Sequence, residues 1–214
     1  MRVVRAMART LAMARTLLRV PWQEAVYWCV DLETTGLDPR SARIVAAAAV
    51  PVRHGVVRCG ELYRTPVRPG RGAVWAGAEA HHLVPQEVED APRVGEVLRR
   101  LDGCLREGVL VVHGSQVELP LLQRAYRMHR MSWPRVPVVD TVRLLQSLER
   151  RVRWLTEGSV PLELGRARAY LGLPPYPRHD AASDAVATAE LFVALAARLS
   201  VRTVDELLRW GGVR

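Results

Sequence analysis

Short apolar runs separated by turn-forming residues recur along the first two thirds of the chain. Their length and composition are typical of β-strands with at least one buried face. The predicted strands are residues 25–31, 43–53, 56–64, 109–112 and 136–139. His54-Gly55 separates the second strand from the third and predicts a tight turn between them. Residues 66–77 are rich in Pro, Gly and Arg, which predicts an exposed loop.

Helical periodicity first becomes clear at residues 93–106, where apolar side chains recur three and four positions apart. Further helices are predicted over residues 117–129, 141–151, 162–171, 181–199 and 204–210. Three leading strands followed by alternating strands and helices predict an α/β fold with a mixed sheet flanked by helices. In such sheets, functional side chains gather at the carboxyl ends of the strands.

The composition suits one soluble domain with a full core. The chain has 214 residues, of which 49% are hydrophobic. No stretch approaches the roughly 18 consecutive apolar residues that a membrane span requires. Cys29, Cys59 and Cys104 form no C-x-x-C pair, so neither a disulfide framework nor a zinc site is indicated. We therefore expect a reducing, cytoplasmic location.

The net charge favours a polyanionic partner. The chain has 31 basic and 22 acidic residues, a formal charge of +9, and an excess of this sign suits phosphate neutralisation and counterion release. A solvated basic surface is the alternative. The same alternatives, a phosphate-binding face or a solvated helix surface, apply to one group of arginines. Its members are Arg150, Arg151, Arg153, Arg166 and Arg168.

The first 24 residues differ in composition from the rest. Residues 7–11 and 13–17 repeat the letters MARTL, and the first twenty residues contain arginines but no acidic residue. This pattern indicates a basic amphipathic helix beside the domain, and an organellar transit peptide and a misassigned start codon are the alternatives. We expect a helical extension over residues 1–24 and one domain over residues 25–214.

Two carboxylates close the first predicted strand. Asp31 and Glu33 are two residues apart, so an extended backbone directs both side chains to the same face. Hard oxygen ligands on a rigid strand suit Mg²⁺ or Mn²⁺ better than zinc. Thr34-Thr35-Gly36 follows as a turn that offers backbone N–H groups. A solvated strand end would share the D-x-E pair, but the full string of residues 31–37, DLETTGL, is more specific.

A histidine and a third carboxylate lie near the other end of the chain. His179 precedes Asp184 by five residues, and Asp180 is placed to cap the helix that begins next. The loop position of His179 would let its imidazole accept a proton from a water molecule beside Asp184 near neutral pH. Taken alone, the pair also fits an ordinary surface histidine and an ordinary acidic first turn.

Taken together, these motifs resemble the DEDD exonuclease superfamily, which includes the epsilon subunit of bacterial DNA polymerase III. The resemblance extends over about residues 27–199. Residues 31–37 match its first motif and residues 179–190, HDAASDAVATAE, its third. Residues 82–84 and 90–92 resemble its H-G-I…D-A-P segment, with leucine in place of glycine, and residues 139–141 match a strand-end D-T. A sister branch has tyrosine where this chain has Asp180, so the histidine branch, DEDDh, is the one resembled.

The resemblance implies a ribonuclease H-like fold with a mixed sheet of about five strands, and an enzyme with two divalent ions, Mg²⁺ or Mn²⁺. Asp31 and Asp184 would hold the ion that activates the attacking water, Glu33 would assist, and His179 would be the general base. Nucleotides would be removed from the 3' end of a strand, with single-stranded DNA as the expected partner and RNA as the alternative. The terminal nucleotide would contact Thr34, Thr35, Gly36, Leu37 and His82.

The second motif departs from the family pattern. Related proteins have H-N-x-x-F-D, whereas residues 113–118 are HGSQVE. Glu118 keeps the carboxylate but is one methylene longer, and Mg²⁺ requires near-ideal octahedral geometry. Ser115 and Glu118 also have the spacing of a helix capping box, in which Glu118 would bond back to the Ser115 backbone. Glu118 is therefore predicted as a metal ligand with this capping role as the alternative.

Two hypotheses follow. In the first, the chain is an active exonuclease acting in DNA repair or proofreading; in the second, it is a catalytically impaired relative that binds nucleic acid or a polymerase. The four retained residues Asp31, Glu33, His179 and Asp184 favour the first, and the altered second motif favours the second. Because few residues follow 204–210, we expect stand-alone trimming or repair rather than stable assembly with a polymerase.

Overall fold

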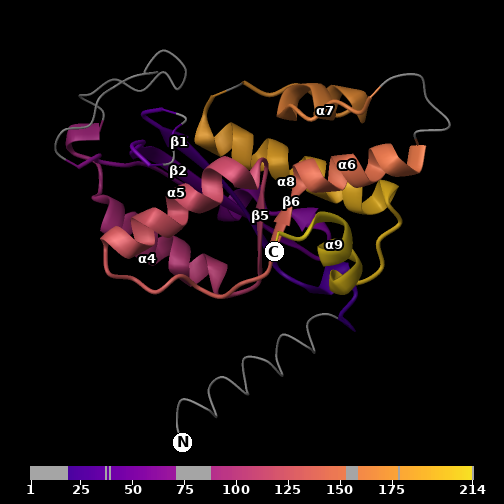
Figure 1. Cartoon of the computed structure of the whole chain (residues 1–214), viewed down its shortest axis with the longest axis horizontal. Helices are drawn as coiled ribbons and strands as arrows, with labels where there is room; N and C mark the ends of the chain where they lie inside the picture. Colours follow the sequence, from indigo (N-terminus) through magenta and orange to yellow (C-terminus); the bar gives the residue numbers. More distant parts are fainter. Residues whose placement is uncertain are drawn as a thin grey trace, which may run out of the picture.

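A six-stranded mixed sheet forms the centre of the computed structural model, which describes residues 19–36, 38, 40–70, 88–152, 159–177 and 179–213 (Figure 1). The strands are β1 (Tyr27–Thr34), β2 (Ile44–Arg53), β3 (Val56–Val57), β4 (Tyr63–Pro66), β5 (Val109–Val112) and β6 (Val138–Asp140). Their order is β3-β2-β1-β5-β6, and β4 also pairs with β2. β1 pairs antiparallel with β2 and parallel with β5, which in turn is parallel to β6. The predicted mixed sheet is confirmed.

The expected strand over residues 56–64 is two strands, which corrects the sequence-based prediction. Continuing the register of β3 along β2 would pair Ala49 with Gly60, but Ala49 pairs with Tyr63. The three additional residues form a 3-10 turn, Cys59–Glu61, all of them exposed. The chain then returns to β2 as β4. Alternating apolar residues indicated extended backbone here, but the break depends on register, which local composition does not encode.

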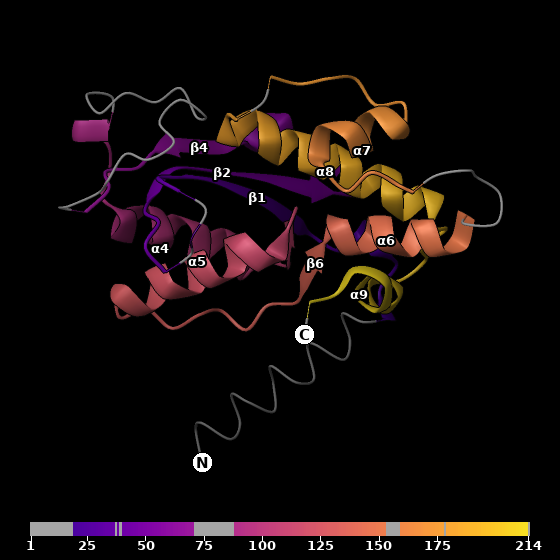
Figure 2. The same ribbon diagram turned by 45° about the horizontal axis from the view of Figure 1, so that its top comes forward.

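Helices cover both faces of the sheet (Figure 2). One face carries α4 (Val94–Leu105) and α5 (Ser115–Met128), whose apolar residues pack with Trp28 and Val30 of β1. The other face carries α6 (Thr141–Val152), α7 (Leu164–Tyr170), α8 (Ala181–Arg198) and α9 (Val204–Gly211). These helices share a core with Tyr27 and Cys29. Successive residues of β1 therefore serve opposite layers, as the two-residue period of a strand requires.

Alanine lies at the contact between α8 and the sheet. Ala48 of β2 and Ala185 and Ala189 of α8 are all fully buried in the same core cluster. Because the distance between packed elements depends on the side chains between them, alanine lets α8 lie close to β1 and β2. The first turns of α8, which hold Asp184, are thereby brought next to the end of β1.

The residues just before the expected domain boundary are packed into the core. Trp22 is buried, and its ring lies 5.9 Å from that of Phe192 between centroids, in an edge-on arrangement. Its backbone N–H donates to the carbonyl of Arg202 at 3.0 Å. Most of the predicted N-terminal extension, residues 1–18, lies outside the described residues. No helix in the described part of the chain is long and apolar enough to cross a membrane.

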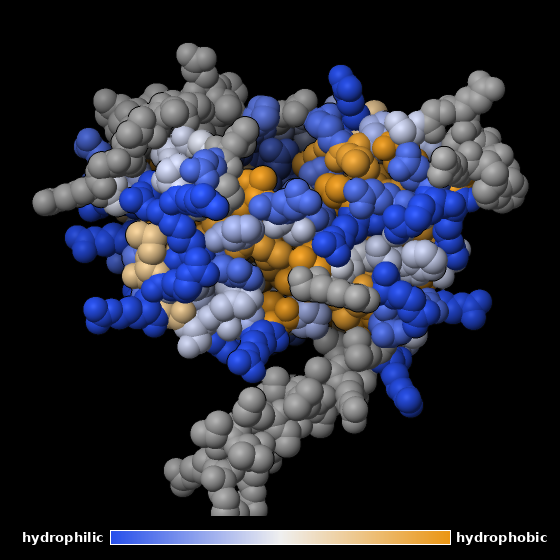
Figure 3. Space-filling model, viewed as in Figure 1, coloured by the Kyte–Doolittle hydropathy of each residue, from blue (hydrophilic) through white to orange (hydrophobic). Residues whose placement is uncertain are grey.

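Most of one molecular face is polar. Figure 3 shows hydrophilic side chains over its outer parts, with apolar side chains reaching the surface in the centre and over α7. Leu162 and Tyr170, which flank or belong to α7, are among the exposed large apolar residues. Scattered exposure of this kind is ordinary for a protein surface and indicates no partner.

Two glycines allow a direct test of the packing. A Cβ at Gly108 would lie 2.0 Å from the carbonyl oxygen of Val26, which accepts the N–H of Val109 at 3.0 Å, so the β1–β5 pairing would have to shift. Gly103, exposed within α4, has no atom within 4 Å of such a Cβ. We expect Gly108→Ala to lower the free energy of unfolding by about 1–3 kcal/mol.

The matched change Gly103→Ala should raise that free energy by about 0.5–1 kcal/mol, because alanine favours a helix interior over glycine. Urea denaturation of the two variants and the wild type measures both effects. Equal stabilities for the two variants would contradict the described approach of residue 108 to β1.

Candidate active site

Asp31 and Glu33 lie on the face of β1 that is covered by α8. They pair across the sheet with Ala48 and Ala46 of β2, whose small side chains leave space above that face. Both acidic residues are half-buried at the carboxyl end of the strand. The register shifts between Glu33 and Thr34, a bulge-like irregularity that ends the regular pairing beside the site. The expectation that the two carboxylates share a face is confirmed.

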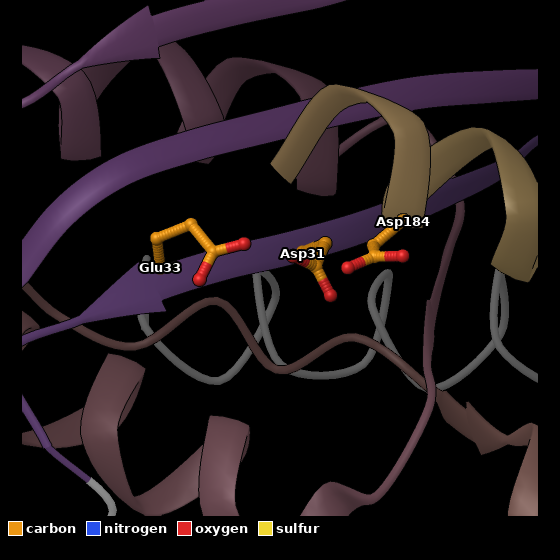
Figure 4. Close-up of side chains that lie close together, drawn as sticks. All are labelled: Asp31, Glu33 and Asp184. Atoms are coloured by element: carbon orange, nitrogen blue, oxygen red, sulfur yellow. The ribbon is translucent and has the colours of Figure 1, made fainter. Parts of the chain in front are cut away.

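Asp184 completes a group of three carboxylates. One oxygen from each of Asp31, Glu33 and Asp184 lies within 4.8 Å of the other two. Figure 4 shows the side chains of Glu33 and Asp184 extending toward Asp31 from opposite sides. Asp184 stands in the first turn of α8, and Asp180 is the N-cap residue that accepts the N–H of Ser183 at 2.9 Å, as predicted. Asp31 and Asp184 are 153 positions apart in the sequence, and strand and helix geometry bring them together.

The electrostatics of this group oppose the charged state of its members. Burial and then the negative charge of Asp184 raise the pKa of Glu33 from its ordinary value to about 7. Burial, followed by the charges of Asp184 and Glu33, also holds the pKa of Asp31 well above its usual range. Carboxylates in such proximity compete for one proton or require a cation between them. The arrangement therefore favours binding of a divalent metal.

Glu118 approaches the group from α5. Burial and then the charge of Asp31 hold the pKa of the Glu118 carboxyl well above its usual range, and Asp140 and Asp184 add to the effect. Its Oε2 atom is buried without a hydrogen-bond partner among the described residues. An unsatisfied buried carboxylate oxygen is costly. Glu118 is not one of the three residues whose oxygens lie within 4.8 Å of one another.

The capping-box alternative for Glu118 is wrong. Gly114, at φ 92°, is the N-cap residue of α5, and the N–H of Ser115 donates to Oδ2 of Asp140 at 2.9 Å. That N–H is the group with which Glu118 would have paired. Because the Asp140 carboxylate already occupies this position, Glu118 remains available to the site.

Asp140 is a structural centre that the sequence did not identify. Its carboxylate accepts three backbone N–H groups, from Gly114 at 3.0 Å, Ser115 at 2.9 Å and Val142 at 2.8 Å. One side chain therefore joins the start of α5 to the start of α6. The neighbouring Thr141 hydroxyl lies 2.8 Å from Nδ1 of His113 and donates to the Val112 carbonyl at 3.2 Å. The strand-end D-T pair was the available signal for this role.

His179 lies beside Asp184 in an uncommon backbone conformation. Its φ is 62°, in the left-handed region that few non-glycine residues adopt. The backbone N–H of His179 donates to Oδ2 of Asp184 at 3.1 Å. The exposed side chain lines a small hollow of about 160 Å³ together with Asp184 and Glu163. The structure thus places the predicted base next to the carboxylate cluster.

Arg168 lines the same hollow, and its position corrects the prediction made from the sequence. The side chain is not part of a surface face but is buried, and Nη2 forms an ion pair with Glu190 at 2.7 Å. Its guanidinium also donates to the carbonyls of Ala187 and Pro174 and lies over the ring of Tyr176. Because these contacts tie α7 to α8 and to the segment before His179, Arg168 supports the loop rather than binding phosphate.

The residues expected to contact a terminal nucleotide are only partly described. Thr34 and Gly36 adjoin the cluster, and the Thr34 hydroxyl donates to the Gly36 carbonyl at 2.7 Å. Thr35 is buried, and its Oγ1 accepts the N–H of Arg43 at 3.0 Å, so this side chain fixes the turn. Leu37 and His82 lie outside the described residues.

Comparison with known sequences identifies the family. Residues 28–192 match the profile of RNase_T, described as "Exonuclease", which covers most of the chain. The chain belongs to the RNase_T exonuclease family. A DNA polymerase III subunit epsilon-like protein of Rhodobacter capsulatus is 34% identical over 87% of this chain and 26% of its own length. The PolC-type DNA polymerase III of Thermotoga petrophila is 27% identical over 80% of this chain and 12% of its own.

Solved structures confirm the fold of this RNase_T exonuclease domain. The E. coli ExoI–ssDNA complex superposes with a TM-score of 0.67 at 16% identity, over 82% of this chain and 41% of that one. Exonuclease X in complex with 5' overhanging duplex DNA gives 0.61 at 20% identity, over 85% and 96%. The cell-death related nuclease CRN-4 gives 0.71 at 14% identity, over 84% and 66%. The ribonuclease H-like fold is therefore shared.

The raised carboxyl pKa values predict how the stability of the metal-free protein depends on pH. A folded carboxyl whose pKa is raised binds more protons than the unfolded chain, so stability falls as pH rises through that interval. For Glu33 the interval runs from its ordinary value near 4.5 to about 7. In EDTA, the Tm should therefore decrease between pH 5 and pH 8, and Mn²⁺ should raise it more at pH 8 than at pH 5.

Glu33→Gln should flatten this pH dependence, whereas Glu89→Gln, at an exposed residue distant from the cluster in sequence, should leave it unchanged. Differential scanning fluorimetry across pH, with and without Mn²⁺, measures the effect. A Tm that falls equally in both variants would show that the carboxylate cluster is not its source.

Proposed function

We propose that this RNase_T exonuclease domain is a metal-dependent 3'→5' exonuclease that releases nucleoside monophosphates from the 3' end of DNA, with RNA as the alternative substrate. The observation that carries the proposal is the group of three carboxylates, Asp31, Glu33 and Asp184, within 4.8 Å of one another. Family membership supports nuclease chemistry at this site. The names of relatives in the DNA polymerase III group support a role in proofreading or repair, in association with a polymerase or alone.

The donor set fits divalent cations with a preference for oxygen. Three carboxylates on rigid elements, with a fourth at Glu118 whose Oε2 has no partner among the described residues, match the ligands of Mg²⁺ and Mn²⁺. Asp31, Glu33 and Asp184, with Glu118, would hold two such ions. When bound, a pair of divalent ions activates water and stabilises the charge that develops on a phosphodiester during displacement.

The residues of the chain would divide the remaining tasks. His179 would accept the proton of the attacking water as the P–O3' bond breaks, and the 3' oxygen of the preceding nucleotide would leave with a proton from solvent. Its position beside Asp184 supports this role, because a general base must lie within hydrogen-bond reach of the water whose proton it accepts. Thr34, Thr35, Gly36, Leu37 and His82 are proposed to contact the terminal nucleotide.

Single-nucleotide release is tested with a single-stranded oligonucleotide labelled at either end. With Mg²⁺ or Mn²⁺, the 3' label should leave first as a mononucleotide and the 5' label should give a descending ladder, and EDTA should abolish both. Asp31→Asn or Asp184→Asn should lower the rate by at least about 10³-fold, since each removes a metal ligand. The control change Glu24→Gln, at an exposed residue outside all of these motifs, should not alter the rate.

Progressive shortening from the 5' end would contradict the assigned polarity. Binding of the oligonucleotide without cleavage under both metals would instead favour the catalytically impaired relative.

The role of His179 is tested by its replacement with asparagine, which tolerates the left-handed backbone better than alanine does. His179→Asn should lower kcat by roughly 10²–10⁴-fold, the usual contribution of a general base, with little change in KM. Single-turnover cleavage as a function of pH provides the measurement. A loss of kcat below about tenfold would assign the base to another group.

Glu118 is the position at which metal preference should be set. Mn²⁺ tolerates looser geometry than Mg²⁺, so a longer carboxylate that is held less closely to the cluster should give a high ratio of Mn²⁺-supported to Mg²⁺-supported activity. Glu118→Asp should raise Mg²⁺-supported activity several-fold and lower this ratio. Glu118→Gln should reduce activity with either metal. Unchanged rates in both variants would remove Glu118 from the metal site.

A further inference from the structure

A basic groove lies on the α4–α5 side of the sheet. It is a hollow of about 660 Å³, within the size range of ligand sites, and four arginines line it: Arg43, Arg68, Arg93 and Arg124. No acidic residue is among its described lining residues. The four side chains come from four different segments, namely the residue before β2, the residue two positions after β4, the N-cap of α4 and the second half of α5.

The positive charge of this groove is only partly compensated within the described chain. Arg68 and Arg93 are both exposed and lie on paired backbone segments, where the Arg68 N–H donates to the Pro92 carbonyl at 2.9 Å. Neither of these two arginines forms an ion pair with a described carboxylate. Two neighbouring guanidinium groups without a counter-charge repel one another, and a phosphate placed between them would relieve this repulsion. The groove therefore suits an anionic ligand.

The floor of the groove is apolar. It includes Ile44 and Leu121, both buried, and Met128, which is 58% exposed. The imidazole of His129 lies against Gly95, where a Cβ would come within 2.9 Å of its Nδ1. Apolar and ring surfaces between cations distinguish this groove from a site for a small inorganic anion. Nucleic-acid bases stack on such surfaces while arginines contact the backbone phosphates.

Two links join residues of the groove lining to residues beside the candidate active site. Thr35, two residues after Glu33, exchanges two hydrogen bonds with Arg43: its N–H donates to the Arg43 carbonyl at 2.9 Å, and its Oγ1 accepts the Arg43 N–H at 3.0 Å. On α5, Leu121 of the floor follows Glu118 by three residues, less than one helical turn. A strand that ends at the carboxylates could therefore continue along this groove.

We propose that the groove binds the part of a single-stranded nucleic acid that lies upstream of its 3'-terminal nucleotide. Arg68 and Arg93 contact successive phosphates, and the bases lie over the floor next to Met128 and His129. This inference rests on the proposed function for the position of the 3' end. The groove sets the affinity for longer strands and the cluster performs the hydrolysis.

The test compares binding of fluorescent single-stranded DNA oligonucleotides of three and twelve nucleotides in EDTA, measured by anisotropy. The double variant Arg68→Gln/Arg93→Gln should weaken binding of the twelve-nucleotide strand by at least about tenfold, with a much smaller effect on the three-nucleotide strand. The slope of log K against log salt should decrease by about 1.4, because each lost phosphate contact on a single strand contributes about 0.7.

Two further variants separate a local contact from net charge. Arg99→Gln/Arg198→Gln removes the same charge from exposed positions outside the groove lining and should change affinity less than threefold. Arg68→Lys/Arg93→Lys keeps the charge and should retain most of the affinity. Equal loss in the Arg68/Arg93 and Arg99/Arg198 glutamine variants, or no loss in either, would overturn the groove assignment.

Cleavage assays distinguish failure of this inference from failure of the proposed function. If the wild-type protein cleaves, the Arg68/Arg93 glutamine variant should show a raised KM for the long strand with little change in kcat. If the wild-type protein does not cleave with Mg²⁺ or Mn²⁺, the proposed exonuclease is wrong. The anisotropy measurements in EDTA decide the groove assignment in either case, because they require no catalysis.

Discussion

Mutual repulsion among carboxylates is the constraint on which the arrangement of this molecule depends. β1 and α8 hold oxygens of Asp31, Glu33 and Asp184 within 4.8 Å of one another, and burial together with the charge of Asp184 raises the pKa of Glu33 to about 7. A flexible chain would separate these groups. Rigid strand and helix positions prevent the separation, so the repulsion is retained until protons or cations neutralise it. The cluster therefore lowers the stability of the metal-free fold, and binding of divalent cations would restore it.

The elements that resist this repulsion lie around the cluster. Buried alanines keep α8 close to the sheet, which fixes the position of Asp184. Asp140 accepts three backbone N–H groups and thereby fixes the starts of α5 and α6. On the opposite side, the ion pair between Arg168 and Glu190 ties α7 to α8 below the loop that contains His179. None of these contacts is made by the three clustered oxygens themselves, but each limits a motion that would let the carboxylates move apart.

Local periodicity was sufficient to predict most elements and to place the side chains of Asp31 and Glu33 on one face of the strand. The strand over Val109–Val112 and the starts of α6, α8 and α9 were predicted to the residue, because apolar spacing and capping residues mark them. Contacts between distant segments were not predictable in this way. The Asp140 carboxylate accepts the hydrogen bond of the Ser115 N–H from 25 residues away. The local capping pattern at Glu118 was therefore misleading. Arg168 had the appearance of a surface residue because its partner, Glu190, lies 22 residues later.

Charge separation relates the cluster to the proposed nucleic-acid groove. The carboxylates would repel the phosphates of a strand in the absence of cations, whereas the neighbouring arginines would attract them. In EDTA, a strand would therefore be held by its upstream phosphates with its end poorly positioned. Two bound divalent cations would neutralise the carboxylates and remove this repulsion from the terminal phosphodiester. Affinity for the strand would then depend on the groove arginines, and positioning of its end on the carboxylate cluster. Substitutions in the groove can therefore change how binding depends on strand length without changing the hydrolysis step.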